Sequence, residues 1–182
     1  MATGSMEQQL QALLDREALI ELVHAYCNAA DREDHAKMRA LYHEDALDDH
    51  GSFFKGLAME FIDRLPEIQA PMEILHHNVT TVNLKLDGDT AEGEVYVIAF
   101  HQVRTAKGFV DLLVGGRYLD KYSKRDGVWK FQYRLGIADW AHLHEPTLVD
   151  LGNDFVSAAV KGARREQDPS YGFFSLFKRG RR

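Results

Sequence analysis

Three side chains that can transfer protons are found in the first half of the sequence: Tyr26, Asp31 and His77. A carboxylate that accepts a hydrogen bond from one imidazole nitrogen fixes the tautomer of the ring, so the other nitrogen is free to take a proton. A tyrosine hydroxyl can donate to a leaving hydroxyl or to a carbonyl oxygen. The trio predicts proton transfer without a cofactor. Spacing alone favours ordinary roles instead, with Asp31 capping a turn, Tyr26 in the core and His77 on the surface.

The elements before the trio's histidine are expected to be helical. Apolar residues recur at helical spacing from Leu10 to Ala30, which predicts a long amphipathic helix ending near Asp31. Two shorter helices are expected at 38–42 and at 61–65, and Pro66 should stop the second of these. Tyr26 and Asp31 would then border a pocket at the end of the first helix.

The second half of the sequence has the pattern of strands. Four segments rich in β-branched and aromatic residues, separated by short turns such as Asp126-Gly127, predict an antiparallel meander over 77–86, 90–103, 109–124 and 128–139. Helices followed by strands indicate an α+β fold, with the helices packed on one face of a curved sheet. If the sheet curls around the first helix, His77 can approach Asp31. The neighbouring His76 would point to the opposite face.

The second of these strands is apolar on both faces. Val95, Val97 and Ala99 share one face, and the residues between and after them, Tyr96, Ile98 and Phe100, share the other. A strand that is apolar on both faces needs cover on both. One face would meet the helices, and the other predicts a homo-oligomer, either a dimer or a trimer.

Further residues can border a pocket for an apolar molecule. His101 shares a strand face with Val97, as a satisfied core histidine or as a second polar group of the pocket. Arg117 and Arg134 lie on neighbouring strands and can bind an anionic or phenolic group, or they can be solvated or salt-bridged. The predicted lining consists of Phe53, Phe54, Val97, Ala99, Trp140 and Leu143.

Composition and motifs exclude several classes of function. The chain has 182 residues, a formal net charge of -6 and a pI of about 5.8, which argues against a nucleic-acid partner. Its single cysteine, Cys27, allows no internal disulfide and is expected to be a small core residue. No stretch approaches the roughly 18 apolar residues that span a membrane. A soluble cytoplasmic protein without a membrane partner is expected.

No cofactor or metal is expected either. His142 and His144 form an HxH pair, but no HExxH helix accompanies it. Gly115-Gly116 lies within a strand and matches neither the GxGxxG pattern of dinucleotide-binding sites nor the GxxxxGK(S/T) pattern of phosphate-binding loops. No GxSxG nucleophile elbow occurs.

The domain is expected to cover residues 6–145, because the first five residues before Met6 look like an expression remnant. Residues 146–182 would carry a helix over 148–163 and a basic, aromatic tail over 164–182. This tail is either mobile or an arm that docks on a neighbouring subunit or covers the mouth of the pocket.

Five segments, in their order along the chain, resemble the SnoaL-like branch of the nuclear-transport-factor-2-like superfamily. The segments are Leu14–Ala18, Tyr26–Asp31, Met38–Asp45, Gly116–Tyr122 and Asp126–Phe131, and the resemblance covers residues 10–142. It implies a cone of curved antiparallel sheet, closed by helices around a deep apolar pocket.

The resemblance also implies a chemistry. Enzymes of this branch, which include dehydratases and a dehydrochlorinase, use a histidine–aspartate dyad without a cofactor. Asp31 and His77 match the dyad, and Tyr26 matches a tyrosine of the branch's bile-acid dehydratase. Ala99 stands where that enzyme has a further aspartate, and His101 can take its place.

Together these observations predict a cofactor-independent lyase, of dehydratase or retro-aldol type, acting on a hydrophobic hydroxylated aromatic or polycyclic molecule such as a lignin-derived diarylpropane. A cofactor-free isomerase or cyclase of a steroid- or polyketide-like substrate, and a non-catalytic ligand-binding domain, are the alternatives.

Overall fold

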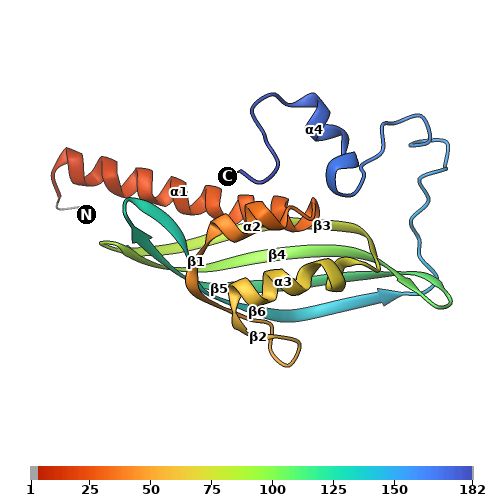
Figure 1. Ribbon diagram of the computed structural model, residues 1–182, viewed down its shortest axis with the longest axis horizontal. Helices are drawn as coiled ribbons and strands as arrows, with labels where there is room; N and C mark the ends of the chain where they lie inside the picture. The colour runs from red at the N-terminus through yellow and green to blue at the C-terminus, as the bar shows by residue number, and fades with distance from the viewer. Residues whose placement is uncertain (1–3, 182) are drawn as a thin grey trace.

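Helices occupy the first part of the chain and long strands the second, as the two kinds of hydrophobic spacing predict (Figure 1). In the computed structural model, which describes residues 4–181, the N-terminal helices are α1 (Met6–Asp31), α2 (His35–Leu41) and α3 (Ala58–Gln69). Ser5 caps α1: its hydroxyl accepts from the Gln8 backbone N–H, and the Gln8 side-chain oxygen accepts from the Ser5 N–H. Ser5 therefore forms the N-cap of α1.

Helix α3 does not end at Pro66 as expected. It continues through this residue to Gln69, although proline removes one N–H from the helical ladder. Pro66 lies on the exposed side of α3, whereas Leu65 and Gln69 are buried against the core. Packing of the buried side therefore holds the last turn in place. None of the helices among residues 4–181 is long and apolar enough to cross a membrane.

The predicted meander is present and forms most of a six-stranded sheet. Its strands are β3 (Met72–Asp87), β4 (Thr90–Thr105), β5 (Gly108–Arg125) and β6 (Val128–His144), each antiparallel to the next. Two strands were not predicted, β1 (Tyr42–Asp49) and β2 (Lys55–Leu57). The strand order is β2-β1-β6-β5-β4-β3, and β1 runs parallel to β6.

Strand β1 escaped prediction because its sequence, YHEDALDD, is rich in acidic residues that strands usually avoid. Pairing with both β2 and β6 provides the hydrogen bonds that its own composition does not favour. Asp48 and Asp49 are buried near its end, where Tyr42 and Lys55 respectively provide partners. Tertiary pairing therefore overrides local propensity in this segment.

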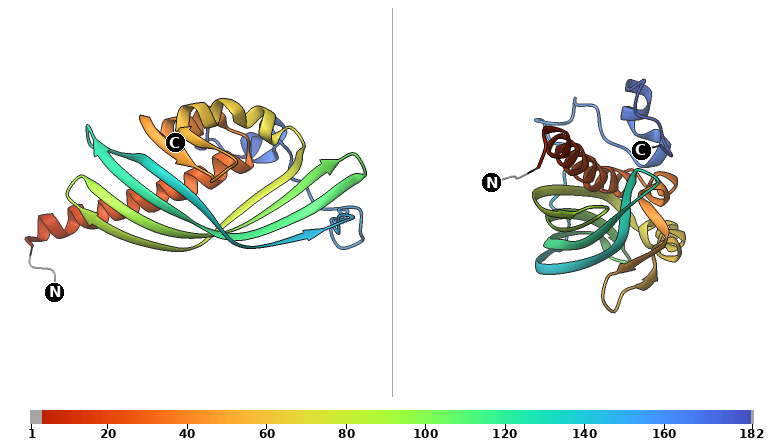
Figure 2. Two further views of the ribbon diagram at one scale, coloured as in Figure 1. Left: turned by 90° about the horizontal axis from the view of Figure 1, so that it is seen from below. Right: turned by 90° about the vertical axis from the view of Figure 1, so that its left-hand side faces the viewer.

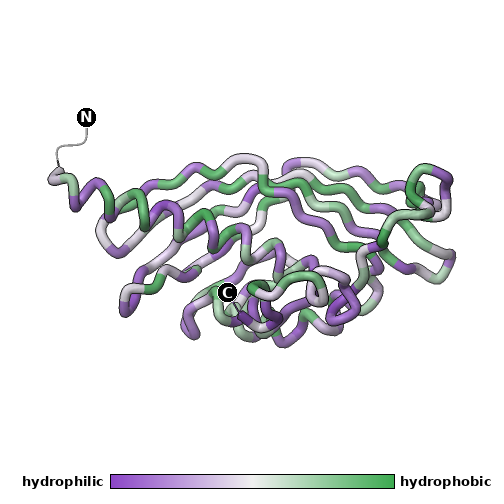
Figure 3. Tube along the Cα trace, turned by 90° about the horizontal axis from the view of Figure 1, so that it is seen from above, coloured by the Kyte–Doolittle hydropathy of each residue, from purple (hydrophilic) through white to green (hydrophobic). Residues whose placement is uncertain are grey.

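The sheet is curved and open, with β2 and β3 as its two edges, and the helices lie along its concave side (Figure 2). Register shifts between Val79 and Thr81 and between Gly115 and Gly116 mark bulges that bend the strands. A Cβ at Gly116 would lie 2.1 Å from the carbonyl oxygen of Ile137, so this bend requires glycine. Hydrophobic and hydrophilic residues alternate along the strands (Figure 3), and the inward set forms the core with α1 and α3.

The outer face of the sheet keeps its apolar side chains exposed. Tyr96 and Ile98 are 40% and 37% exposed, whereas Val95 and Val97 on the inner face are buried. The prediction that β4 carries apolar side chains on both faces is therefore confirmed. The subunit interface expected on the outer face stays a prediction.

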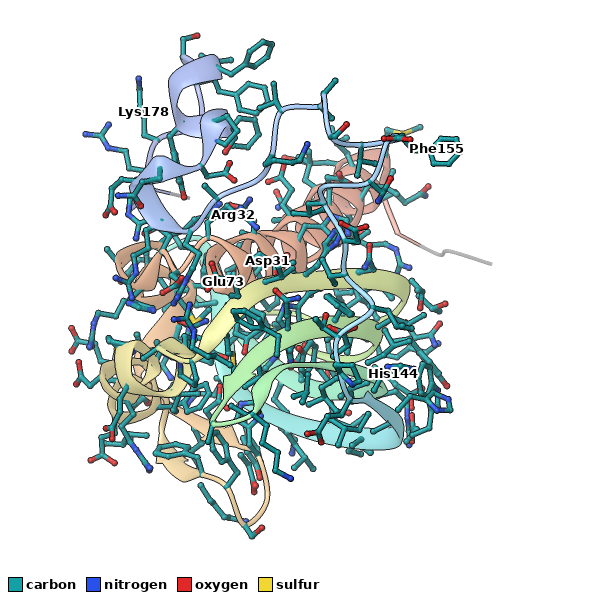
Figure 4. All side chains as sticks on the ribbon, turned by 90° about the vertical axis from the view of Figure 1, so that its right-hand side faces the viewer. Asp31, Arg32, Glu73, His144, Phe155 and Lys178 are labelled. Carbon is teal, nitrogen blue, oxygen red and sulfur yellow. The ribbon has the colours of Figure 1, made fainter. Side chains whose placement is uncertain are left out.

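Residues 148–163 do not form the expected helix. They fold as turns in which side chains compete with the helical ladder: Gly152 N–H donates to the Asp150 carboxylate, and Phe155 N–H donates to the Asn153 side chain. Within residues 146–181, helix is confined to η1 (Arg165–Gln167) and α4 (Pro169–Phe173). Phe155 points away from the body of the protein (Figure 4).

Residues 163–181, called the C-terminal arm below, pack against the turn that joins α1 to α2. Glu33, in this turn, is 1% exposed and pairs with Arg164 at 2.6 Å and with Arg165 at 2.9 Å. Arg32 pairs with Asp168 at 2.5 Å. The arm thus docks on its own chain, directly after Asp31. Figure 4 shows Asp31 and Arg32 at the end of α1, with the arm on one side and β3 on the other.

Candidate active site

Asp31 and His77 meet where the end of α1 approaches β3. His77 Nδ1 lies 2.6 Å from Asp31 Oδ1, and the His77 backbone N–H also donates to the Asp31 carboxylate, at 3.0 Å to Oδ2. Both side chains are largely buried. Since the carboxylate can only accept, Nδ1 carries the proton of the neutral ring, and Nε2 is left as the basic nitrogen. His76, the next residue back along β3, is exposed on the other face.

Tyr26 is buried on the inner side of α1. Its ring packs edge-on against Tyr42, Tyr118 and Phe131. Burial, with the negative charge of Asp48, raises the pKa of Tyr26 well above its ordinary value, and Arg134 offsets this only in part. The hydroxyl therefore stays protonated and can act as a hydrogen-bond donor.

His101 lies beside the pair on β4, with its ring centroid 5.4 Å from that of His77. Burial, followed by the charge of a protonated His77, lowers the pKa of His101 to about 4, against a smaller opposing effect of Asp31. His101 is therefore neutral near pH 7, where it can donate or accept a hydrogen bond but carries no charge.

This lowered pKa predicts a pH-dependent stability. The unfolded chain binds a proton at His101 below its ordinary value of 6.5, whereas the folded protein does so only near 4. The free energy of unfolding should therefore fall as the pH drops through this window, by about 1–2 kcal/mol at pH 5 from this group. Urea denaturation at pH 7, 6 and 5 measures it. In His101→Gln, the free energy of unfolding should depend less steeply on pH than in wild type. In His142→Gln, which changes an exposed histidine, the pH dependence should equal that of wild type. An equal pH dependence of the free energy of unfolding in wild type and His101→Gln would contradict the assignment of this effect to His101.

A cavity of about 400 Å³ opens beside His77 and His101, within the range of small-molecule sites. Its polar lining includes Tyr26, His77, His101 and two residues that were not predicted, His50 and Gln69. The rest of the lining is mainly apolar and includes the predicted Phe53, Val97 and Ala99. A larger hollow of about 660 Å³, around Lys85, Glu92 and Lys121, shares no residue with this cavity and contains no histidine.

Neither predicted arginine borders the cavity. Arg117 lies on the outer face, because it alternates with the inward Gly116 and Tyr118, and it pairs with Glu94 and Asp139. Arg134 is 0% exposed and donates to both carboxylate oxygens of Asp120, at 2.8 and 2.7 Å. Their predicted role in substrate binding is therefore wrong, and the alternative of a salt-bridged arginine holds for both.

Three of the predicted apolar lining residues also lie elsewhere. Trp140 is 45% exposed and pairs with Gly115, beyond the register shift that turns it to the outer face. Leu143 is 66% exposed near the end of β6 and does not border the cavity. The indole of Trp140 occupies the space over Gly115, on the outer face. Phe54 is buried against Phe61 of α3, with a ring-centroid distance of 5.1 Å, and does not reach the cavity.

Cys27 is buried and free, as expected. Burial raises the pKa of its thiol to about 12, so it is not an activated nucleophile. Among residues 4–181, no three His, Cys, Asp or Glu side chains gather as a metal site requires.

Comparison with known proteins places this arrangement in a family. The profile of the SnoaL-like domain matches residues 11–135, well over half of the chain. The chain belongs to the SnoaL-like domain family. The matched range of the SnoaL-like domain includes Asp31, His77 and His101 and ends within β6, before the C-terminal arm. No curated protein matches the sequence.

Solved structures share the fold of this SnoaL-like domain. The hexachlorocyclohexane dehydrochlorinase LinA type 2 has a TM-score of 0.71 and 21% identity, over 78% of this chain and 97% of its own. A candidate scytalone dehydratase from Novosphingobium aromaticivorans has a TM-score of 0.66 and 18% identity, over 86% and 95%. A candidate aromatic ring hydroxylase from the same organism has a TM-score of 0.64 and 24% identity, over 72% and 93%. The similarity establishes an α+β fold in which N-terminal helices pack on an open, curved sheet.

Proposed function

We propose that this protein is a cofactor-independent lyase that acts on an apolar, hydroxylated aromatic or polycyclic molecule. The observation that carries the proposal is the His77–Asp31 contact of 2.6 Å at the wall of a largely apolar cavity. An oriented imidazole beside an apolar cavity is suited to removing a proton from a substrate carbon, because the imidazolium that forms is stabilised by the carboxylate. The roles of His77 and Asp31 follow from this geometry.

In a dehydration, His77 Nε2 takes the proton from carbon, the C–H electron pair forms the double bond, and the C–O bond to the neighbouring carbon breaks. The departing oxygen needs a hydrogen-bond donor as charge develops on it. Tyr26, which stays protonated, and neutral His101 are proposed here to donate hydrogen bonds to a departing or carbonyl oxygen of the substrate without giving up their protons. In a retro-aldol cleavage the same base removes a hydroxyl proton, the O–H electron pair forms a carbonyl, and the C–C bond breaks. Its electron pair passes to the other carbon, which then takes up a proton or expels a leaving group.

Two of the structural neighbours support an elimination. One is named a hexachlorocyclohexane dehydrochlorinase and another a candidate scytalone dehydratase. Each name denotes loss of a small molecule from a ring. Because the fold itself hosts several reactions, the side chains at the cavity wall carry the proposal and the names support it.

The test is a substrate screen in D₂O with wild type and His77→Ala in parallel. The panel contains lignin-derived diarylpropanes, hydroxylated steroids, polyketide-type hydroxyketones and hexachlorocyclohexane. Mass spectrometry follows loss of water or of hydrogen chloride, release of formaldehyde, and incorporation of deuterium. The expected result is turnover of at least one oxygenated member by wild type that is absent from His77→Ala.

The products separate the alternatives. Loss of water indicates a dehydratase, and release of formaldehyde from a diarylpropane indicates a retro-aldol lyase. A product of unchanged mass would instead indicate an isomerase or cyclase. Binding of panel members without turnover or deuterium exchange would contradict an enzymatic function and favour a ligand-binding domain.

A further inference from the structure

A second histidine–carboxylate pair lies at the cavity, formed by His50 and Asp48. His50 Nε2 is 2.7 Å from Asp48 Oδ1, and Asp48 is fully buried. The other oxygen of Asp48 accepts a hydrogen bond of 2.6 Å from the Tyr42 hydroxyl. The approach of His50 Nε2 to Asp48 Oδ1 lacks good hydrogen-bond geometry, and neither atom has another hydrogen-bond partner among the described residues, so the pair is held as a charge contact.

His50 is held in one orientation. Its ring stacks on Phe61 of α3 with a centroid distance of 4.6 Å. Its backbone N–H donates to Phe54 at 2.7 Å and its carbonyl accepts from Phe53, which fixes the tight loop after β1. An imidazole that is stacked and backed by a buried carboxylate is pre-organised to present its remaining nitrogen in a fixed direction.

The remaining nitrogen of His50 lies close to Gly136. A Cβ at Gly136 would lie 3.1 Å from His50 Nδ1 and 3.6 Å from its Cε1. Both His50 and Gly136 line the cavity. The His50 side chain is 24% exposed and lines the cavity, so its ring can meet a bound molecule, and a side chain at Gly136 would press against Nδ1.

The two pairs approach the cavity from opposite parts of the sheet. His77 lies on β3, at one edge, and His50 follows β1, beyond β4, β5 and β6. Both line the same space of about 400 Å³. A molecule that fills this space would contact one imidazole at each end.

We infer that His50 is the acid of the reaction, paired with His77 as the base, and that a conjugated system joins the acidic C–H of the substrate to an oxygen leaving group at the far end of the cavity, in an extended form of the elimination between neighbouring carbons. This inference rests on the proposed function. The C–H proton passes to His77 Nε2, and the C–H electron pair moves through the conjugated double bonds as the C–O bond breaks. The leaving oxygen takes the Nδ1 proton of His50, which enters the step as an imidazolium with its Nε2–H facing Asp48. His50 ends neutral and His77 protonated, and the next cycle begins after both exchange protons with solvent. Asp48 and Tyr42 are positioning residues, because they act through His50.

The first experiment asks whether an oxygenated aromatic ligand reaches both rings. The imidazole Cε1–H signals of His50 and His77, assigned from the His50→Gln and His77→Gln proteins, are followed by NMR while 2-naphthol is added. Both signals should shift with one Kd, and the signal of His43, which contacts the Ser123 carbonyl, should not move. A shift of His77 alone overturns the inference. If neither moves, the cavity does not take hydroxylated aromatics, and the proposed function fails as well.

The second experiment separates base from acid on the substrate found in the screen. His50→Gln should keep His77-dependent C–H to C–D exchange in D₂O but lower the rate of C–O cleavage by at least about 10²-fold. His77→Gln should lose both. Gly136→Ala, which places a methyl group against Nδ1, should lower cleavage in the same way without removing the imidazole. His43→Gln is the control on the same part of the chain. Wild-type cleavage by His50→Gln would overturn the inference and leave the proposed function standing.

Discussion

The His77→Gln protein is expected to turn over its substrate about 10²–10⁴-fold more slowly than wild type, the usual contribution of a general base. Glutamine keeps much of the imidazole's volume and can still donate to Asp31, so the local structure should survive. It has no nitrogen that takes a proton near neutral pH. The expected loss is therefore in kcat rather than in KM, because the interaction removed develops in the transition state.

Two further variants make this result specific. His76→Gln changes the adjacent histidine, which is exposed on the other face of β3, and should retain wild-type kcat. Asp31→Asn keeps the shape of the partner but removes the charge that stabilises an imidazolium, so it should also lower kcat. Initial rates, with circular dichroism to verify folding, measure all three. A His77→Gln protein with the wild-type kcat would remove His77 from the mechanism.

The Arg134→Met protein is expected to be less stable by about 3–5 kcal/mol, because it leaves a buried carboxylate without its cation. Asp120 is buried, and its remaining hydrogen bond comes from the Tyr122 hydroxyl at 2.7 Å. The guanidinium also stacks on three rings, with centroid distances of 4.1 Å to Tyr26, 4.1 Å to Tyr118 and 4.2 Å to Phe131. Such a loss is a large part of the 5–15 kcal/mol that stabilises an ordinary domain.

Chemical denaturation with guanidinium chloride measures this difference. Arg117→Met is the matched control, since Arg117 also pairs with two carboxylates but on the outer face of the sheet, and it should change stability much less than Arg134→Met does. The double variant Arg134→Met, Asp120→Leu should recover much of the loss, because neither charge is then buried alone. Equal effects of Arg134→Met and Arg117→Met would contradict the role of the buried pair.

The meander and the Asp31–His77 contact could be predicted because their signals are local and repeated. Alternating apolar residues define β3 to β6, and the long period-3.6 pattern places Asp31 at the end of α1. A curved sheet with helices on its concave side then brings the start of β3 to that helix end. His101 followed from strand parity, since Val97, Ala99 and His101 all line the cavity.

Residues beyond a bulge or within an acidic segment could not be placed in this way. One register shift in the pairing of β5 and β6 separates Trp140 from the cavity that Ile137 lines. Strand parity alone cannot distinguish a cavity arginine from Arg134, which is buried deeper with Asp120. Asp48 lies near the end of β1 and His50 directly follows this strand, whose acidic sequence gives no strand signal. Their pairing therefore becomes evident only when β1 is seen beside β6.

The docked C-terminal arm changes where the folding unit ends. The family match stops at residue 135, yet Glu33 depends on Arg164 and Arg165, and Asp34 accepts a hydrogen bond of 2.7 Å from Gly180 N–H. A truncation at residue 145 would leave a buried glutamate without its cations two positions after Asp31. Residues beyond the family match are thus expected to brace the turn that directly follows Asp31, the aspartate of the proposed dyad.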